Sequence, residues 1–584
     1  MDIFTILALI GGLALFLYGM ELMGNSLKKL AGGKLESILA RLTSNRFLGF
    51  LLGFGVTAII QSSSATTVML VGFVNSGIMT LGQTISIIMG ANIGTTVTSW
   101  LLSTASIDGT NWMRLLKPES FTPVLALIGL LLILMAKSDK RKNTGTILMG
   151  FAVLMFGMEM MSGSMEGLKD NETFRNLLIM FENPIMGIIV GTVFTAIIQS
   201  SSASVGVLQA LSISCNIPFA TAIPIILGQN IGTTITPIIS SISGNLESKR
   251  VAMSCLYIKM IGVIVVMSGF YGLNAIVGFD FMSKNVSAFD IAVVHTLFNI
   301  VSTVILLPFC SLIEKLAIKT VRSKKEQKEV DAFATLDDRF LSMPSFAVEK
   351  ATDLVNDMLC LSNESFRKAV TLLDKYDPAV FEEVSEIENA IDKYEDKIST
   401  YLIRIAEHEM TAEDSKHVSE LLHCVGDIER ISDHALNIAE AAREIDDKKI
   451  SFSSQAKKDI GIITDAVSEI LELTVTTLCE EDVEGAARVE PLEQVIDRLK
   501  RKIKNGHIDR LRQGDCTMEM GFVLSDLLTN YERISDHCSN IAVCVIEIHS
   551  DNFETHEYLG RLKSGKETEF VQMYENYKNK YYIG

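Results

Sequence analysis

Apolar residues form membrane-length runs up to about residue 318 of this 584-residue chain, whereas from Val321 onward the sequence is charged and helical in period. Seven runs are long enough to predict membrane spans, at about 3–23, 78–104, 121–137, 143–163, 217–243, 251–275 and 289–315. Two further segments, 47–76 and 185–216, each consist of two shorter apolar arms joined by Gln-Ser-Ser-Ser. Arms of this length predict a re-entrant hairpin better than a complete crossing.

The membrane part repeats itself at a constant offset of 138 residues. Gly-Met-Glu at 19–21 returns at 157–159, Gln-Ser-Ser-Ser at 61–64 returns at 199–202, and the GxNIGTT phrase at 90–96 returns at 228–234. We therefore expect two membrane repeats, 1–137 and 138–275, followed by a final transmembrane helix and connection at 276–320. Three spans per repeat is an odd number, so the second copy is predicted to insert inverted relative to the first.

Charge gives the expected orientation of the repeats in the membrane. With the N-terminus outside, the loops assigned to the cytoplasm hold eleven Lys and Arg residues and the outer loops hold five. This places the soluble half of the chain in the cytoplasm and the whole protein in the cell membrane as a multi-pass protein. The net charge of −17 gives no reason to expect a nucleic-acid partner.

Two polar phrases interrupt the apolar segments where Leu and Val would be expected. The glycines of the GxNIGTT phrase can unwind a helix, so we expect a broken helix at each copy of it. Hydroxyl and carbonyl oxygens suit a sodium ion, while serine hydroxyls and helix N-termini suit an anion. Polar groups at membrane depth are tolerated only inside protein or around a cavity, so both hairpin tips are expected to line one site. The alternative is tight helix packing, in which Gly, Ser and Thr also take part. The candidate substrate and ion ligands are Gln61, Ser62, Ser63, Ser64, Thr66, Thr67, Asn92, Thr95, Thr96, Gln199, Ser200, Ser201, Ser202, Ser204, Asn230, Thr233 and Thr234.

Other polar residues of the spans are weaker candidates. Glu21 and Glu159 recur at the repeat offset near a span end, which fits either an ion ligand or an interfacial carboxylate. Lys259 and His295 occur once each, and we leave both out of the site. No His or Lys base accompanies the serines in both repeats, so an enzyme with a serine nucleophile is not expected.

The second half divides into a linker at 321–340, a helical domain at 341–560 and a tail at 561–584, and it also contains a repeat. GDIERISDHALNIAE at 426–440 corresponds to TNYERISDHCSNIAV at 529–543. Carboxylates spaced i, i+4 share one helix face and repel unless a cation joins them. Such clusters suit Mg, Mn, Fe or Ca better than zinc, whereas a solvated acidic face is the alternative. The carboxylate pairs are Glu388 and Asp392, Glu429 and Asp433, Glu493 and Asp497, and Glu532 and Asp536. His434 and His537 are candidates for supporting or capping roles.

These phrases resemble a known family. TAIIQSSSATT and GxNIGTT, with QSSS in both halves of an inverted repeat, are similar to the type II sodium-dependent phosphate cotransporters, specifically the bacterial branch with a C-terminal PhoU-like domain. The ERISDH strings look like those of PhoU, a phosphate-regulatory protein whose two three-helix bundles carry metal clusters. The resemblance implies an all-α polytopic transporter that imports inorganic phosphate with sodium and is regulated by its PhoU-like bundle. A phosphate exporter and a membrane-anchored phosphate sensor stay open as alternatives, as do the sodium stoichiometry, the metal and homo-oligomer formation.

Overall fold

The computed structural model describes residues 3–31, 45–104, 118–165, 181–322, 332–548 and 568–583. Within these ranges the regular elements are helices, apart from one isolated β-bridge between Pro218 and Asn285. The chain separates into two compact units, residues 1–346 and 347–584. We call the first the membrane unit and the second the bundle unit, and we describe each by itself.

The membrane unit contains the two repeats and two further helices. The first repeat comprises α1 (Ile3–Ala31), α3 (Arg46–Ile60), α4 (Ser63–Asn75), α5 (Leu81–Gly94), α6 (Thr96–Ser103) and α7 (Pro118–Met135). The second comprises α8 (Asp139–Met165), α10 (Pro184–Ile198), α11 (Ser201–Ser214), α12 (Phe219–Gly232), α13 (Ile235–Ser241) and α14 (Leu246–Val277). They are followed by α15 (Ala288–Leu306) and α16 (Cys310–Thr320).

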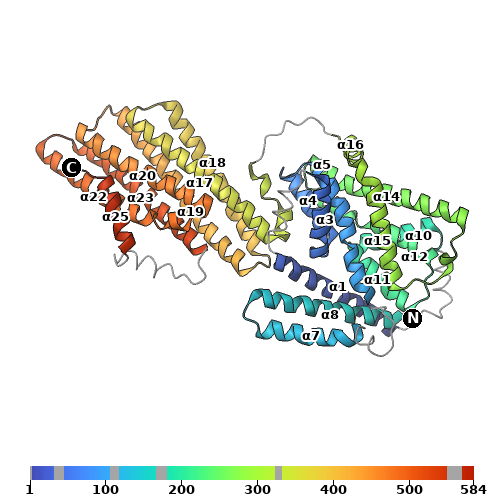
Figure 1. Ribbon diagram of the computed structural model, residues 1–584. Helices are drawn as coiled ribbons and strands as arrows, with labels where there is room; N and C mark the ends of the chain where they lie inside the picture. Colours follow the sequence, from blue (N-terminus) through green and yellow to red (C-terminus); the bar gives the residue numbers. More distant parts are fainter. Residues whose placement is uncertain are drawn as a thin grey trace. The chain divides into compact units, whose positions relative to one another are not determined.

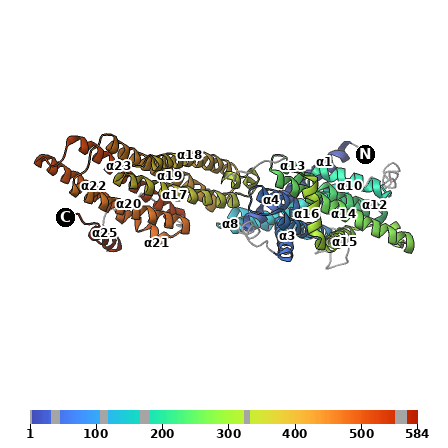
Figure 2. The same cartoon turned by 90° about the horizontal axis from the view of Figure 1, so that it is seen from above.

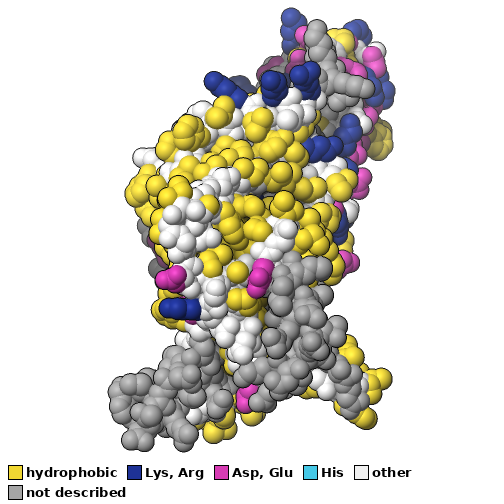
Figure 3. Space-filling model, turned by 90° about the vertical axis from the view of Figure 1, so that its right-hand side faces the viewer, with side chains coloured by type: hydrophobic (Ala, Val, Ile, Leu, Met, Phe, Trp, Pro, Cys, Tyr) yellow, Lys and Arg dark blue, Asp and Glu magenta, His cyan; other side chains and the backbone are white. Residues whose placement is uncertain are grey.

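Six helical segments of the described chain are long and apolar enough to cross a membrane, against seven expected from the sequence. The six are 3–30, 81–103, 140–165, 219–241, 246–277 and 288–320. The seventh expected span, 121–137, corresponds to α7, whose apolar stretch Ser120–Met135 is shorter. Exposed hydrophobic side chains are frequent on this unit, and Figure 3 shows a face on which they dominate and charges are sparse. The chain is thus a multi-pass membrane protein.

Both predicted hairpins are present as pairs of short helices. The first, α3 and α4, breaks at residues 61–62, and the second, α10 and α11, breaks at residues 199–200. At each break the glutamine adopts a left-handed backbone, with φ of 61° at Gln61 and 60° at Gln199. Because this conformation is uncommon for a residue with a Cβ, its occurrence at equivalent positions shows that the two repeats share the same turn.

Helices α1 and α8 show that the repeats are inverted (Figure 1). They pack through glycines so closely that a Cβ on Gly12 would lie 3.0 Å from the carbonyl oxygen of Gly157, and one on Gly19 would lie 2.7 Å from that of Gly150. As numbers rise along α1 they fall along α8, so the two helices are antiparallel. Gly150 and Gly157 are the repeat equivalents of Gly12 and Gly19. Equivalent helices that meet antiparallel require an inverted arrangement of the two copies.

Glycines also bring each hairpin against the helix that follows it. A Cβ on Gly53 would lie 2.1 Å from the carbonyl oxygen of Ile87 in α5, and one on Gly191 would lie 2.2 Å from that of Ile225 in α12. No side chain fits at these distances, so the backbones of α3 and α10 contact α5 and α12 directly. The contact fixes the first arm of each hairpin beside the GxNIGTT phrase.

The segment treated as a linker packs on the first hairpin. Its short 3-10 helices, η6 (Ala332–Thr335) and η7 (Asp338–Ser342), belong to the membrane unit. Phe340 is fully buried against Phe73 of α4, with ring centroids 5.6 Å apart. The amide of Asn75 donates to the carboxylate of Asp337 at 2.6 Å. The end of the linker is therefore part of the membrane unit rather than a free connection.

The bundle unit consists of long helices around an apolar core (Figures 1 and 2). Phe366 and Tyr531 are fully buried there, and their ring centroids lie 6.1 Å apart. Residues 568–580, which lie within the segment predicted to be a tail, form helix α25, and this helix packs on α22. The helices are α17 (Pro344–Asp374), α18 (Pro378–Ala406), α19 (Ala412–Asp447), α20 (Ser454–Glu480), α21 (Val483–Ala486), α22 (Val489–Gln513), α23 (Met518–Ile548) and α25 (Thr568–Lys580).

Two glycines of α3 provide a test of the backbone contact. We expect Gly53→Ala to lower the thermal stability of the purified protein, because overpacking of this kind costs roughly 1–3 kcal/mol. Gly55→Ala is the matched control, since a Cβ there meets nothing within 4 Å and alanine is the better helix former. Thermal unfolding in detergent measures both. Equal melting temperatures for the two variants would contradict the close contact between α3 and α5.

Candidate functional site

The two QSSS tips contact each other in the membrane unit, although Gln199 is itself exposed whereas Gln61 is buried. The hydroxyl of Ser64 donates to the carbonyl oxygen of Gln199 at 3.3 Å, although the two residues are 135 positions apart. Ser62 and Ser200 cap the second helix of each hairpin by accepting the backbone N–H of the residue three positions later, at 3.1 and 3.2 Å. Helices α4 and α11 therefore begin at the tips, with their N-termini there. A helix N-terminus carries unpaired N–H groups and partial positive charge, which favours an anion.

Several of the candidate hydroxyls already have structural partners. Thr57 and Thr66 share a hydrogen bond of 3.0 Å, and their equivalents Thr195 and Ser204 share one of 2.7 Å. Thr67 donates to the backbone of its own helix. The first two bonds join the two arms of each hairpin, and those of Thr67 stay within α4. Thr66, Thr67 and Ser204 thus have packing roles that the sequence alone did not separate from ligand binding.

The serines next to the caps differ from these. Ser63 and Ser201 are repeat equivalents at the first position of their helices. Both are buried, with 7% and 5% of the residue surface exposed. Within the described part of the chain, neither hydroxyl has a hydrogen-bond partner, and the same holds for Ser202. Gln61, by contrast, accepts a hydrogen bond of 2.7 Å from Thr98 of α6. Because these hydroxyls lie at helix N-termini and have no hydrogen-bond partner among the described residues, they are the best ligand candidates of the phrase.

The GxNIGTT phrases interrupt the helices as the sequence predicted. α5 ends at Gly94 before α6 begins at Thr96, and α12 ends at Gly232 before α13 begins at Ile235. All four threonines of these phrases donate to carbonyl groups of their own helix, at 2.7–3.0 Å. The back-bonds explain how the broken turn is satisfied. The asparagines of the two phrases differ from each other. Asn230 accepts a hydrogen bond of 2.8 Å from Lys259, whereas Asn92 has no side-chain hydrogen bond to a described residue.

Lys259 is the functional candidate that sequence reasoning left out. A lone lysine in an apolar span was itself the available signal, because ionisable residues at membrane depth are costly. His295 is also buried and shares a hydrogen bond of 3.0 Å with Ser99 of α6. Glu21 and Glu159, by contrast, are exposed on the surface of α1 and α8.

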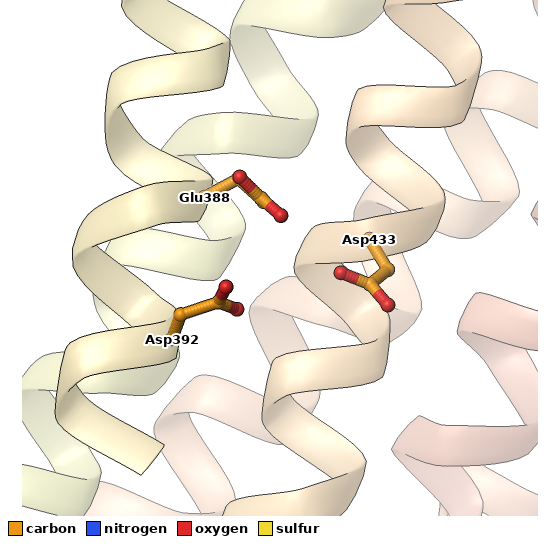
Figure 4. A group of neighbouring side chains, drawn as sticks. All are labelled: Glu388, Asp392 and Asp433. Carbon is orange, nitrogen blue, oxygen red and sulfur yellow. The ribbon is translucent and has the colours of Figure 1, made fainter. Parts of the chain in front are cut away.

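In the bundle unit, three predicted carboxylates converge (Figure 4). Glu388 and Asp392 of α18 and Asp433 of α19 each place an oxygen within 4.8 Å of the others. Burial, followed by the charge of the neighbouring Asp433, raises the pKa of Glu429 to about 7. The pKa values of Glu388 and Asp433 are also raised, with burial as the main cause and neighbouring carboxylates adding to it. Among the described residues, no Lys or Arg forms an ion pair with these four carboxylates.

The equivalent carboxylates of the second copy lie in a different electrostatic setting. Lys500 lies 2.8 Å from Glu532, whereas the position equivalent to Lys500 in the first copy is Glu395. Arg501 lies 3.8 Å from Asp497. Asp536 has Arg533 as its neighbour at 3.6 Å. Within the described chain, Glu493, Asp497, Glu532 and Asp536 do not form a metal-ligand group, whereas the first copy does.

The two histidines of the ERISDH strings connect α19 and α23. Nδ1 of His434 lies 2.9 Å from Oδ1 of Asn530, and Nδ1 of His537 lies 2.7 Å from Oδ1 of Asp427. Their rings stack with centroids 5.8 Å apart. These contacts give both histidines a role in packing the two copies of the bundle together rather than in capping a helix.

Comparison with known proteins assigns families to both units. A family model described as Na+/Pi-cotransporter matches residues 15–163 and 153–289, and the PhoU domain model matches 355–442 and 460–545. The "Putative inorganic phosphate export protein YjbB" of Salmonella typhimurium is 24% identical over 563 residues, covering 95% of this chain and 100% of that protein. The "Uncharacterized protein YqeW" of Bacillus subtilis is 31% identical over 304 residues, or 52% of this chain and 93% of that protein.

A solved structure, PhoU from Pseudomonas aeruginosa, is also similar to part of the chain. It shares 22% identity with a TM-score of 0.33, and the match covers 34% of this chain and 95% of that one. Taken with the duplicated QSSS hairpins and the antiparallel pairing of equivalent helices, the family matches identify both parts of the molecule. The chain belongs to the Na+/Pi-cotransporter family and carries a PhoU domain after its membrane unit.

Proposed function

We propose that this protein is a sodium-coupled secondary transporter that carries inorganic phosphate across the cytoplasmic membrane by alternating access. The observation that supports this most directly is the meeting of the two hairpin tips at Ser64 and Gln199. Ser63 and Ser201, whose hydroxyls have no partner in the described part of the chain, begin the two helices there, and helix N-termini suit a phosphate anion. Because the two hairpins belong to inverted repeats, a relative movement of the repeats would expose the same site to either side.

Sodium coupling supplies the driving force in this proposal. One sodium ion that enters down a tenfold gradient and about 100 mV releases roughly 3.7 kcal/mol, the sum of about 1.4 and about 2.3. Two or three ions would therefore support uphill uptake of a divalent anion. Import is the direction that an inward sodium gradient drives. In the proposed orientation the N-terminus is outside and the PhoU domain lies in the cytoplasm, where it regulates the transporter.

Export is the second candidate. A relative that matches over 95% of this chain bears the name "Putative inorganic phosphate export protein YjbB". A transporter with this fold would release phosphate if its cytoplasmic concentration were high and sodium coupling were weak. A phosphate sensor that transports little is a third alternative, favoured by the regulatory type of the bundle unit.

Flux in proteoliposomes distinguishes these functions. We expect the full-length protein to accumulate radiolabelled phosphate against its gradient when an inward sodium gradient is imposed, and to stop when the gradient is dissipated. Downhill phosphate flux that is unaffected by sodium would instead support the exporter. A correctly reconstituted protein that moves no phosphate in either direction would contradict transport and favour the sensor.

The unpartnered serines give a test of the site itself. We expect Ser63→Ala and Ser201→Ala to raise the half-saturating concentration of phosphate or sodium about ten- to a hundredfold, because a hydrogen bond to a charged ligand contributes roughly 1.5–3 kcal/mol. Since phosphate and sodium binding are linked, both apparent affinities should move together. Ser76→Ala is the control, because this hydroxyl donates to carbonyl oxygens of its own helix outside the tips. Unchanged affinities in both tip variants would assign these serines to packing.

We further propose that the bundle unit binds a divalent or iron-type metal ion in its first copy. The donor set fits, because Glu388, Asp392, Asp433 and Glu429 offer only oxygen atoms and none of them forms an ion pair with Lys or Arg in the described chain. Burial raises the pKa of Glu388, Glu429 and Asp433, with neighbouring carboxylates adding to the shift. In the second copy, Lys500 supplies the positive charge to Glu532 itself. A bound metal would relieve the carboxylate repulsion and hold α18 against α19.

Equivalent double variants test this assignment. We expect Glu429→Ala with Asp433→Ala to abolish bound manganese in the purified full-length protein, because Asp433, one of the three converging oxygen donors, and its neighbour Glu429 are both lost. The matched control is Glu532→Ala with Asp536→Ala, which is expected to retain the metal. Lys500→Glu gives the second copy the residue that the first copy has at the equivalent position, Glu395, and is expected to add a second bound ion. Metal analysis after dialysis against manganese measures all three, and an equal loss in both double variants would contradict a metal site confined to the first copy.

A further inference from the structure

Lys259 is a buried cation within the membrane unit. It lies in α14, its residue is 7% exposed, and its ammonium donates to Oδ1 of Asn230 at 2.8 Å and to Oδ1 of Asn299 at 3.4 Å. Asn230 belongs to the second GxNIGTT phrase, and Asn299 lies in α15. Close packing fixes this arrangement, because a Cβ on Gly262, one turn after Lys259, would lie 2.2 Å from the hydroxyl of Ser302 in α15.

The surroundings of Lys259 provide oxygen atoms but no counter-charge. Within the described chain, no Asp or Glu lies within ion-pair distance of its ammonium. Both of its partners are neutral carboxamide oxygens, and their amide nitrogens donate to backbone carbonyls at 3.0 and 2.9 Å. Carboxamide oxygens fixed in this way are the type of ligand that a hard cation takes. The ammonium of Lys259 therefore lies where a small cation would be coordinated.

The first repeat has the corresponding asparagine without the lysine. Asn92 is the repeat equivalent of Asn230, and its side chain is buried to 6% exposure. Among the described residues it has no side-chain hydrogen bond, and the position equivalent to Lys259 is Phe121. Phe121 stacks on Phe151 of α8, with ring centroids 6.1 Å apart. In the second copy of the duplicated phrase the asparagine thus contacts a cation attached to the chain, whereas in the first copy the asparagine has no side-chain partner among the described residues.

We propose that the ammonium of Lys259 takes the place of one coupling sodium ion in the second repeat, whereas an exchangeable sodium ion binds at Asn92 in the first. This inference rests on the proposed sodium-coupled phosphate transport and deepens it by assigning the ion sites. A tethered cation neutralises substrate charge without entering or leaving with the substrate. The two-fold duplicated site consequently couples fewer sodium ions than its symmetry would give.

The proposal predicts that removing the lysine creates a sodium site. In proteoliposomes with full-length protein, Lys259→Met is expected to raise the number of sodium ions coupled per phosphate by one and to raise the half-saturating sodium concentration. Lys259→Arg keeps the charge at this position and is expected to keep the wild-type sodium coupling. The coupling number is read from the phosphate gradient that balances an imposed sodium gradient at a clamped membrane potential.

A binding measurement supplies a second readout that does not require the Met variant to fold. Sodium is expected to raise the melting temperature of the purified wild-type protein, since a ligand that binds the folded state stabilises it. Asn92→Ala is expected to reduce this sodium-dependent shift, whereas Phe121→Leu is the matched control in the first repeat and is expected to keep it. Potassium chloride at equal ionic strength controls for general salt effects.

Each outcome decides the proposal. A Lys259→Met variant with the wild-type coupling number, or one that elutes normally but has lost phosphate flux even at high sodium, would overturn it. The proposal would also be overturned if a proton gradient drove phosphate flux in the wild type but not in Lys259→Met. The lysine would then carry a proton instead of replacing a sodium ion. An unreduced sodium shift in Asn92→Ala would also overturn it. Wild-type protein without sodium-driven phosphate flux would instead refute the proposed function and leave the sodium-binding measurement as the separate test of this inference.

Discussion

Polar groups inside a membrane must find their partners within the protein, and this constraint determines the organisation of the membrane unit. Each hairpin ends at membrane depth in a glutamine with a left-handed backbone and a serine that caps the next helix. Neither tip could be exposed to lipid at an acceptable cost. Their meeting at Ser64 and Gln199 satisfies part of this requirement and leaves the hydroxyls of Ser63 and Ser201 without a hydrogen-bond partner among the described residues. The same constraint that brings the tips together therefore also places these hydroxyls at two helix N-termini.

Backbone contact through glycine holds the site in place. The first arm of each hairpin packs directly on the broken helix, and α1 packs directly on α8, because side chains are absent at the points of contact. In a membrane, association of helices depends on close packing more than on the hydrophobic effect, so these glycines carry much of the structural specificity. Since the contacts recur at equivalent positions, the two repeats are held together by the same kind of backbone packing.

Both units then depart from their own symmetry in the same way. The second copy of the GxNIGTT phrase has Lys259 on its asparagine, and the second carboxylate cluster has Lys500 beside Glu532. In each case the first copy keeps oxygen atoms without a basic partner within the described chain. A duplicated site can lose one exchangeable cation when a lysine supplies the charge, because the ammonium meets the same oxygen ligands. The repeated fold is thus retained while the charges at the two copies of each cluster differ.

The sequence by itself determined the repeats, the hairpins, the broken helices and the division into a membrane part and a helical bundle. These features follow from local patterns: apolar length, polar interruptions, and phrases that return at a fixed offset. Only the tertiary structure decided which of the candidate residues have partners. Thr66 and Ser63 are equally polar in the sequence, yet one bonds Thr57 and the other has no described partner, because the packing of the hairpin arms sets the difference. Lys259 and Asn230 lie 29 positions apart, and no local pattern reports a contact that depends on how α14 crosses α12.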